Sequence, residues 1–167
     1  MANVTQPLRE EHRELYPHVE ELRVVADKVG KVPIETLRHD VDSAYTFLAH
    51  HLIPHAYAED HALYPVVDRL MGSSRATATM SRDHVEVGRL TDELGELRGK
   101  LTSGPLSEPL ATDLRRVLYG LYALVKVHFA KEEEVYLPLL DAHLTTTEAR
   151  DLFAAMEAAA RGAKAQA

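Results

Sequence analysis

The sequence predicts an all-α protein, namely an up-down-up-down antiparallel four-helix bundle with a short C-terminal helix. Three observations support this. Apolar residues recur at spacings of three and four over four long segments. Short segments that contain Pro, Gly or Ser separate those segments. No stretch alternates between apolar and polar residues as a half-buried strand would. Long helices joined by short links favour an antiparallel bundle.

The first helix is expected over residues 6–29. Thr5 is a suitable cap, and Pro7 suits the first turn of a helix because its missing N–H would lack an intrahelical partner there. Pro17 lies inside the helix, so we expect a kink or an open backbone hydrogen bond at that point.

The second helix is expected over 34–70, where Pro54 and Pro65 should bend it. The third helix is expected over 77–101 and the fourth over 110–140. The inward stripe of the fourth helix is predicted to contain Leu114, Val117, Leu121, Leu124, His128, Glu132, Val135 and Leu139.

The chain is expected to divide into a bundle over 1–143 and a tail over 144–167. The bundle is predicted to consist of two related helical hairpins, about 6–70 and 77–140, because the sequence repeats itself over these ranges. The tail is predicted to start with a Thr145–Glu148 capping box, to form an amphipathic helix, and to fray at its end.

Composition narrows the function. A chain of 167 residues with 46% hydrophobic residues is long enough for one domain with a real core. A net charge of −7 argues against nucleic-acid binding, and no segment predicts a membrane span or a signal peptide. Cysteine is absent, which excludes disulfides, thiolate metal sites and cysteine nucleophiles, and fits a cytoplasmic protein. Ten histidines are many for this length.

Four of the histidines belong to a pattern that occurs twice, and each copy contains two His and one Glu. The pattern consists of His12, His55 and Glu59 and, 72 or 73 positions later, His84, His128 and Glu132. Each His-x-x-x-Glu spacing puts both side chains on one face of a helix, in line with the apolar stripe. Burying an ionised Glu without a partner would lower the stability of the fold by roughly several kcal/mol, so these residues need a compensating charge. Two metal ions, bridged by the carboxylates, would supply it.

Ligand counting indicates an open centre. Four imidazoles and two bridging carboxylates leave about two positions free on two six-coordinate ions. Free positions favour chemistry or small-ligand binding over a purely structural metal. These ligand types suit iron, zinc and manganese alike.

The pattern resembles the hemerythrin-like family, also described as the His-His-Glu (HHE) cation-binding family. The resemblance covers roughly residues 8–140 and is carried by the two lone histidines and the two His-x-x-x-Glu pairs. It implies an oxo- or hydroxo-bridged centre of two iron ions, held by the two His-His-Glu sets, that meets O₂, peroxide or NO.

The sequence departs from the O₂ carriers of that family in two places. Gly88 stands where they have a second His one turn along the third helix, and the fourth helix has His-x-x-x-Glu instead of His-x-x-x-x-Asp. These departures favour a more reactive or sensing centre over reversible O₂ storage. His18 is a candidate for the missing ligand, and His51 for a further ligand or a neighbour that hydrogen-bonds one.

Three functions remain open at this point. The centre would either bind and sense or store O₂, NO or iron, or act as a peroxide- or NO-consuming oxidoreductase, or hold another divalent metal such as zinc or manganese. The partner is expected to be a small gaseous or peroxide ligand, and the sequence does not indicate an oligomeric state.

The remaining polar residues are interpreted more simply. Four acidic residues beside the predicted ligands are interpreted as surface charge: Glu11, Asp60, Asp83 and Glu133. Most tyrosines are expected in the core or at its rim, and Tyr45 and Tyr122 are the candidates for facing the centre.

Overall fold

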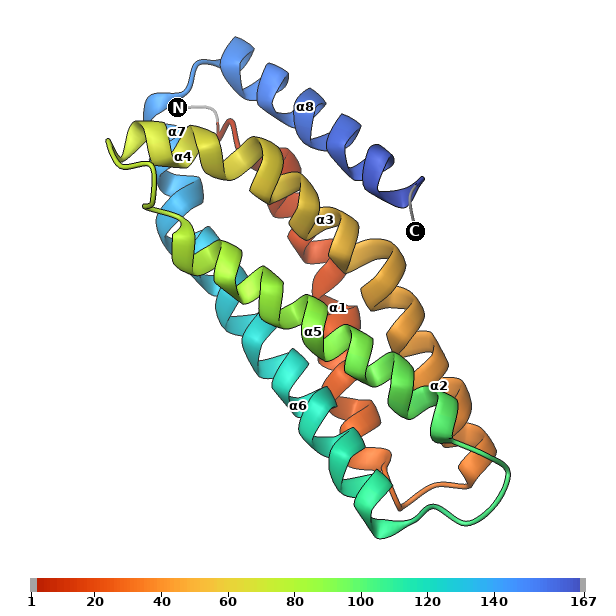
Figure 1. Ribbon diagram of the computed structural model, residues 1–167. Coiled ribbons are helices and arrows are strands. Elements are labelled where there is room, and N and C mark those ends of the chain that lie inside the picture. The colour runs from red at the N-terminus through yellow and green to blue at the C-terminus, as the bar shows by residue number, and fades with distance from the viewer. Residues whose placement is uncertain (1–2, 166–167) are drawn as a thin grey trace.

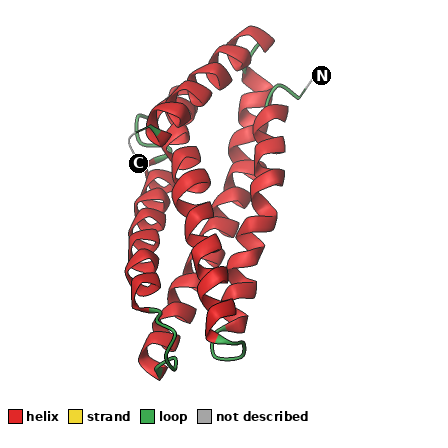
Figure 2. Ribbon diagram, turned by 90° about the vertical axis from the view of Figure 1, so that its right-hand side faces the viewer, coloured by secondary structure: helices red, strands yellow, loops and turns green. Residues whose placement is uncertain are grey.

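The computed structural model describes residues 3–165, which are helical apart from short loops and contain no strand (Figure 2). This confirms the all-α class and a helical bundle. Four long helical runs, here called rods, make up most of it. The first rod is α1 (Gln6–Lys28) and the third is α5 (Ala78–Lys100). The second consists of α2 (Ile34–Phe47), η1 (Leu48–Leu52), α3 (Ile53–Ala58), η2 (Glu59–Leu63) and α4 (Tyr64–Leu70). The fourth consists of α6 (Glu108–Lys131), η3 (Glu132–Tyr136) and α7 (Leu137–His143).

The rods pack around a common core. Helix α1 packs against α2 and α6, and α5 packs against the same two elements (Figure 1). Helix α1 stays one α-helix through Pro17, so the chain continues past this residue without a break. None of the described helices combines the length and the apolar character that crossing a bilayer requires.

Three π-helical turns, which the sequence analysis did not predict, interrupt the second and fourth rods. These turns are η1, η2 and η3. A proline is the second residue of the α-helix after each of them: Pro54, Pro65 and Pro138. A proline inside an α-helix has no N–H to donate and clashes with the carbonyl four residues earlier. The wider turn before each proline accommodates both effects.

Each π-turn adds one residue and therefore shifts the inward face. The predicted inward position Val135 is wrong, because its side chain is 53% exposed. Tyr136 and Leu140 are buried instead, each one residue after a predicted inward position. On the second rod, Leu63 and Val67 follow Glu59 into the core at the same spacing of four. The shift therefore begins at the two glutamates of the predicted metal site.

The core has two apolar clusters with a polar layer between them. The larger cluster fills the end of the bundle that holds the loops after α1 and α5, and includes Leu15 and Leu52. The smaller cluster lies beyond the η2 and η3 turns and includes Leu8 and Leu63. His12 falls between Leu8 and Leu15 on α1. The predicted ligands thus occupy the layer where the apolar core is interrupted.

Helix α8 (Thr146–Lys164) lies outside the four rods and packs against α3 and η2 (Figure 1). The predicted capping box is confirmed, because Thr145 accepts a hydrogen bond from the backbone of Glu148 while the Glu148 side chain accepts from Thr145. The helix extends to Lys164, and residues 166–167 of the predicted frayed tail lie outside the described residues.

Candidate metal centre

All four rods contribute to one polar layer. Its six side chains are the predicted ones: His12 of α1, His55 of α3, Glu59 of η2, His84 of α5, His128 of α6 and Glu132 of η3. Both glutamates have no exposed surface, and the four imidazoles are at most 8% exposed at the side chain. Residues that lie far apart in the sequence therefore meet at one level of the bundle.

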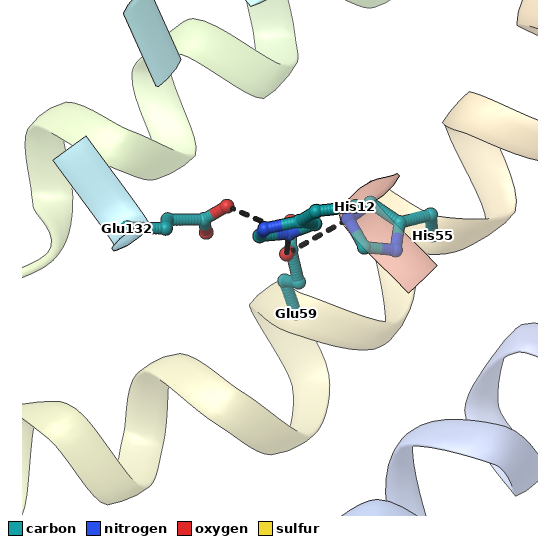
Figure 3. Close-up of side chains that lie close together, drawn as sticks. All are labelled: His12, His55, Glu59 and Glu132. Atoms are coloured by element: carbon teal, nitrogen blue, oxygen red, sulfur yellow. Dashed lines mark ion pairs between the residues drawn. The ribbon is translucent and has the colours of Figure 1, made fainter. Parts of the chain in front are cut away.

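Four of the six form a first group (Figure 3). His12 Nε2 lies 3.4 Å from Glu132 Oε2 and 3.7 Å from Glu59 Oε1. His55 Nε2 lies 3.0 Å from the same Glu59 oxygen. One ligand atom from each of these residues lies within 4.8 Å of the others, which is the spacing that a single metal ion requires.

A second group shares Glu59 with the first. His84 Nε2 lies 3.2 Å from Glu59 Oε2, and His128 Nε2 lies 3.8 Å from it. The two Nε2 atoms are 3.0 Å apart. The two oxygens of Glu59 thus face different groups.

The outward nitrogen of each imidazole faces a carboxylate. The Nδ1–oxygen pairs are His12–Glu133 at 2.9 Å, His55–Glu11 at 3.0 Å, His84–Asp60 at 2.9 Å and His128–Asp83 at 3.0 Å. The interpretation of these four acidic residues as surface charge is therefore wrong. An ionised carboxylate only accepts hydrogen bonds, so each Nδ1–H donates and each Nε2 faces the layer.

The repeat contained a signal for these carboxylates. Glu11 and Asp83 each directly precede the lone histidine of their half, and Asp60 and Glu133 each directly follow the glutamate. Their partners lie on other rods, however, so the spacing along one helix does not reveal them. A search for every acidic residue that occurs in both halves beside a candidate ligand would have found all four.

Tyr64 also reaches the centre and was missed. Its hydroxyl donates to Glu132 Oε1 at 2.7 Å and lies 3.1 Å from His128 Nε2 and 3.4 Å from His84 Nε2. The η2 turn brings Tyr64 to this position, and the sequence analysis did not predict that turn. Tyr45 lies instead against Arg98.

The other proposed tyrosine and the two further histidines lie outside the centre. Tyr122 is half-buried and its hydroxyl lies beside Glu20 and Lys126. His18 and His51 are exposed and line a surface cavity between α1 and α2. Neither histidine belongs to either group of clustered ligand atoms.

Electrostatics tie the imidazoles to the carboxylates. Burial lowers the pKa of His128, but contacts with Glu132 and Glu59 outweigh it and raise this pKa to about 10. Burial also lowers the pKa of His55, but the Glu59 charge and the Glu11 contact outweigh it and raise this pKa well above its usual value. For Glu59, burial favours a higher pKa, but His55 and the other histidines hold it well below its usual range. Without bound metal, protons on these imidazoles supply the positive charge that the buried glutamates require.

The donor set fits metal ions. Five buried side-chain atoms have no hydrogen-bond partner among the described residues: His12 Nε2, His55 Nε2, both Glu59 oxygens and Glu132 Oε2. Each such atom costs roughly 1–3 kcal/mol when it is left unpaired, and more when it is charged. All five converge on the polar layer, and nitrogen and oxygen atoms of these types are ligands for iron, zinc and manganese.

Comparison with known families agrees with this geometry. The profile of the family described as the hemerythrin HHE cation-binding domain matches residues 3–140. The match includes all six clustered side chains and ends before α8. Neither a curated protein nor a solved structure matches the chain.

Proposed function

Because this chain belongs to the hemerythrin HHE cation-binding family, we propose that its centre binds two iron ions and reacts with a small molecule of the O₂, peroxide or NO type. The family binds metal cations, and the His/Glu cluster has the composition and spacing of a metal site. What we propose beyond metal binding is the number of ions, their identity and the reaction. Convergence of five unpartnered buried atoms from both halves of the chain is the observation that carries the proposal.

In this proposal, His12 and His55 hold one ion while His84 and His128 hold the other. Glu59 would supply one oxygen to each group, since its two oxygens face different groups, and Glu132 would supply its Oε2 to the first group. The up-down-up-down antiparallel order of the rods is part of the proposal. Packing of α1 and α5 each against α2 and α6 supports that order.

Iron bound there would supply redox chemistry toward small oxidants. The chain's own residues define the surroundings of that chemistry. The four outer carboxylates hold the imidazoles in one tautomer and orientation. Phe129 packs on the ring of His12 and helps to bury it. The Tyr64 hydroxyl oxygen lies 2.7 Å from Glu132 Oε1 and donates its proton to it, on the side of His84 and His128.

The first test is metal analysis of the protein as purified, together with its optical spectrum before and after peroxide. Two iron ions per chain are expected, with an absorption band that bleaches on turnover. Gas evolution would support a peroxide-consuming enzyme, whereas a reversible change on O₂ exposure would support binding or sensing. Zinc or manganese as the bound metal would contradict the iron assignment.

The matched variants for that test are His84→Ala and His143→Ala. His84→Ala should lose most of the bound metal and lower Tm, because His84 Nε2 lies 3.2 Å from a buried Glu59 oxygen, whose charge would be less well compensated without it. His143 is exposed on α7, so its variant should keep the metal content of the parent. Two iron ions per chain in His84→Ala would refute the ligand assignment.

A further inference from the structure

A surface cavity of about 490 Å³ opens between α1 and α6, and the ring of His12 forms part of its wall. Phe129 lies beside that ring, with ring centroids 4.4 Å apart and planes tilted by 13°. Mostly apolar cavities of this size with a few polar groups are typical sites for organic molecules. O₂, peroxide or NO would fill only a small part of it. The function proposed above therefore does not account for the cavity.

The charges around the cavity are unequal. Arg9, Arg13 and Lys126 line it, and Glu133 is the carboxylate among the lining residues. Arg9 and Glu133 form an ion pair with each other, and Glu133 also holds His12. Arg13 and Lys126 are therefore the two cations whose charge no lining residue compensates.

The ionic partners of both cations outside the cavity are exposed. Arg13 lies 3.5 Å from Glu10, and these side chains are 67% and 58% exposed. Lys126 lies 3.2 Å from Glu20, with side chains 45% and 32% exposed, and it also donates to the Tyr122 hydroxyl at 2.8 Å. Exposed ion pairs stabilise little, so both side chains can turn toward an anion, Lys126 by exchanging its contacts with Glu20 and Tyr122 for it.

The other half of the molecule serves as an internal comparison. The contact region between α3 and α5 corresponds to this cavity, because His84 and Asp60 occupy the places of His12 and Glu133. The remaining positions differ: Ser81, Val85, Ile53 and Tyr57 stand where the cavity has Arg9, Arg13, Lys126 and Ala130. Both halves position their imidazoles alike, so neither the fold nor the metal ligands require the cations or the small residue at 130.

We propose that the cavity between α1 and α6 binds a small organic anion with an apolar, ring-shaped body. Its anionic group lies near Arg13 and Lys126, and its body packs against Phe129 and Tyr16, one imidazole ring away from the centre. The role of this anion as a second reactant beside the ions rests on the proposed function. Its binding does not, because every group that contacts it is protein.

Benzoate is the probe, measured by equilibrium dialysis against the protein as purified, with neutral benzamide as its isostere. Benzoate should bind at least about tenfold more tightly than benzamide. Ala130→Trp fills the cavity from an exposed position and should weaken benzoate binding by about tenfold or more. Tyr57→Trp places the same side chain at the corresponding position of the other half and should leave the affinity unchanged.

The role of each cation is tested by replacing it with the residue at the corresponding position of the other half. Arg13→Val and Lys126→Ile should each weaken benzoate binding about fivefold and leave benzamide unaffected. Arg82→Val removes an equal charge from an exposed position on α5 and should have no effect. Equal affinity for benzoate and benzamide, full affinity in Ala130→Trp, or no benzoate binding at millimolar concentration would each overturn the proposal.

Repeating the dialysis on zinc-loaded protein separates this inference from the proposed function. Benzoate affinity that is retained with zinc shows that the cavity acts independently of iron. If metal analysis refutes the iron centre, the benzoate result still stands. If benzoate fails to bind, the metal assignment is untouched.

Discussion

The hairpin of residues 6–70 and the hairpin of residues 78–143 supply matching ligands and matching outer carboxylates, yet their surroundings differ. Tyr64 reaches the centre from the first hairpin, and Leu137 occupies the corresponding place in the second. Phe129 of the second hairpin covers His12, whereas Ala56 corresponds to it in the first. The residues that repeat place charge in the core, whereas the residues that differ determine which side chains contact each side of the polar layer.

The largest expected effect comes from the residue that both groups share. Glu59→Gln should weaken binding of both ions by more than about 100-fold, because changes to residues that only support ligands already cost about 10- to 100-fold. Glu132→Gln should cost less, since Tyr64 already donates to its Oε1, the oxygen that lies 3.5 Å from His128 Nε2, whereas both Glu59 oxygens lack a donor among the described residues. Titration of chelator-treated protein with ferrous iron measures both. Equal losses would show that the two glutamates are equivalent.

The histidines and glutamates of the layer predict a pH dependence that bound metal reverses. In chelator-treated protein, the pKa of His128 rises from 6.5 to about 10 despite burial, because of Glu132 and Glu59. Its contribution to stability is fully present below about pH 6.5 and is lost as the pH rises toward 10. Metal binding instead requires neutral imidazoles and strengthens with pH.

The measurement is Tm with and without metal between pH 6.5 and 10. The Tm difference between metal-loaded and metal-free protein should widen as the pH rises. Metal-loaded protein should release its metal as the pH falls through about 6.5. A difference that stays constant or narrows over this range would contradict the proposed pairing of histidines and glutamates. Bringing the pH back up should restore the bound metal.

Smaller effects are expected from the outer carboxylates, and they compare the halves directly. Glu11→Gln and Asp83→Asn remove the negative charge from the acceptors of His55 and His128 and should each weaken metal binding by about 10- to 100-fold. Asp83 should matter more, because its side chain is 18% exposed whereas that of Glu11 is 49% exposed. Iron titration of both variants tests this order, with Glu134→Gln on the exposed side of η3 as the control.

The last comparison concerns folding stability in place of metal affinity, at a residue that has no equivalent in the second half. Tyr64→Phe leaves Glu132 Oε1 without its donor and should destabilise chelator-treated protein by about 1.5–3 kcal/mol, the range for hydrogen bonds to charged groups. Tyr136→Phe is the control, because no hydrogen bond of the Tyr136 hydroxyl is found among the described residues. Urea unfolding gives both values. An unchanged midpoint for Tyr64→Phe would show that this hydrogen bond contributes nothing.

The sequence was sufficient to predict the helices and to select the six clustered residues, because helical spacing and an internal repeat are both properties of the chain itself. It misplaced Val135 and missed Tyr64, because a π-turn changes the inward register by one residue and periodicity analysis assumes a uniform helix. Proline six residues after each glutamate was the available signal, at Pro65 and Pro138. Glu11 and its three counterparts were misread because their partners lie on neighbouring rods.

The polar layer between the two apolar clusters has a consequence for how the molecule unfolds. The end built from α4, α7 and α8 has its own apolar cluster, and the layer separates it from the larger one. Regions with separate packing open with separate free energies. Ions held by ligands from all four rods would join the two regions into one cooperative unit, and their removal would let the chain melt in stages.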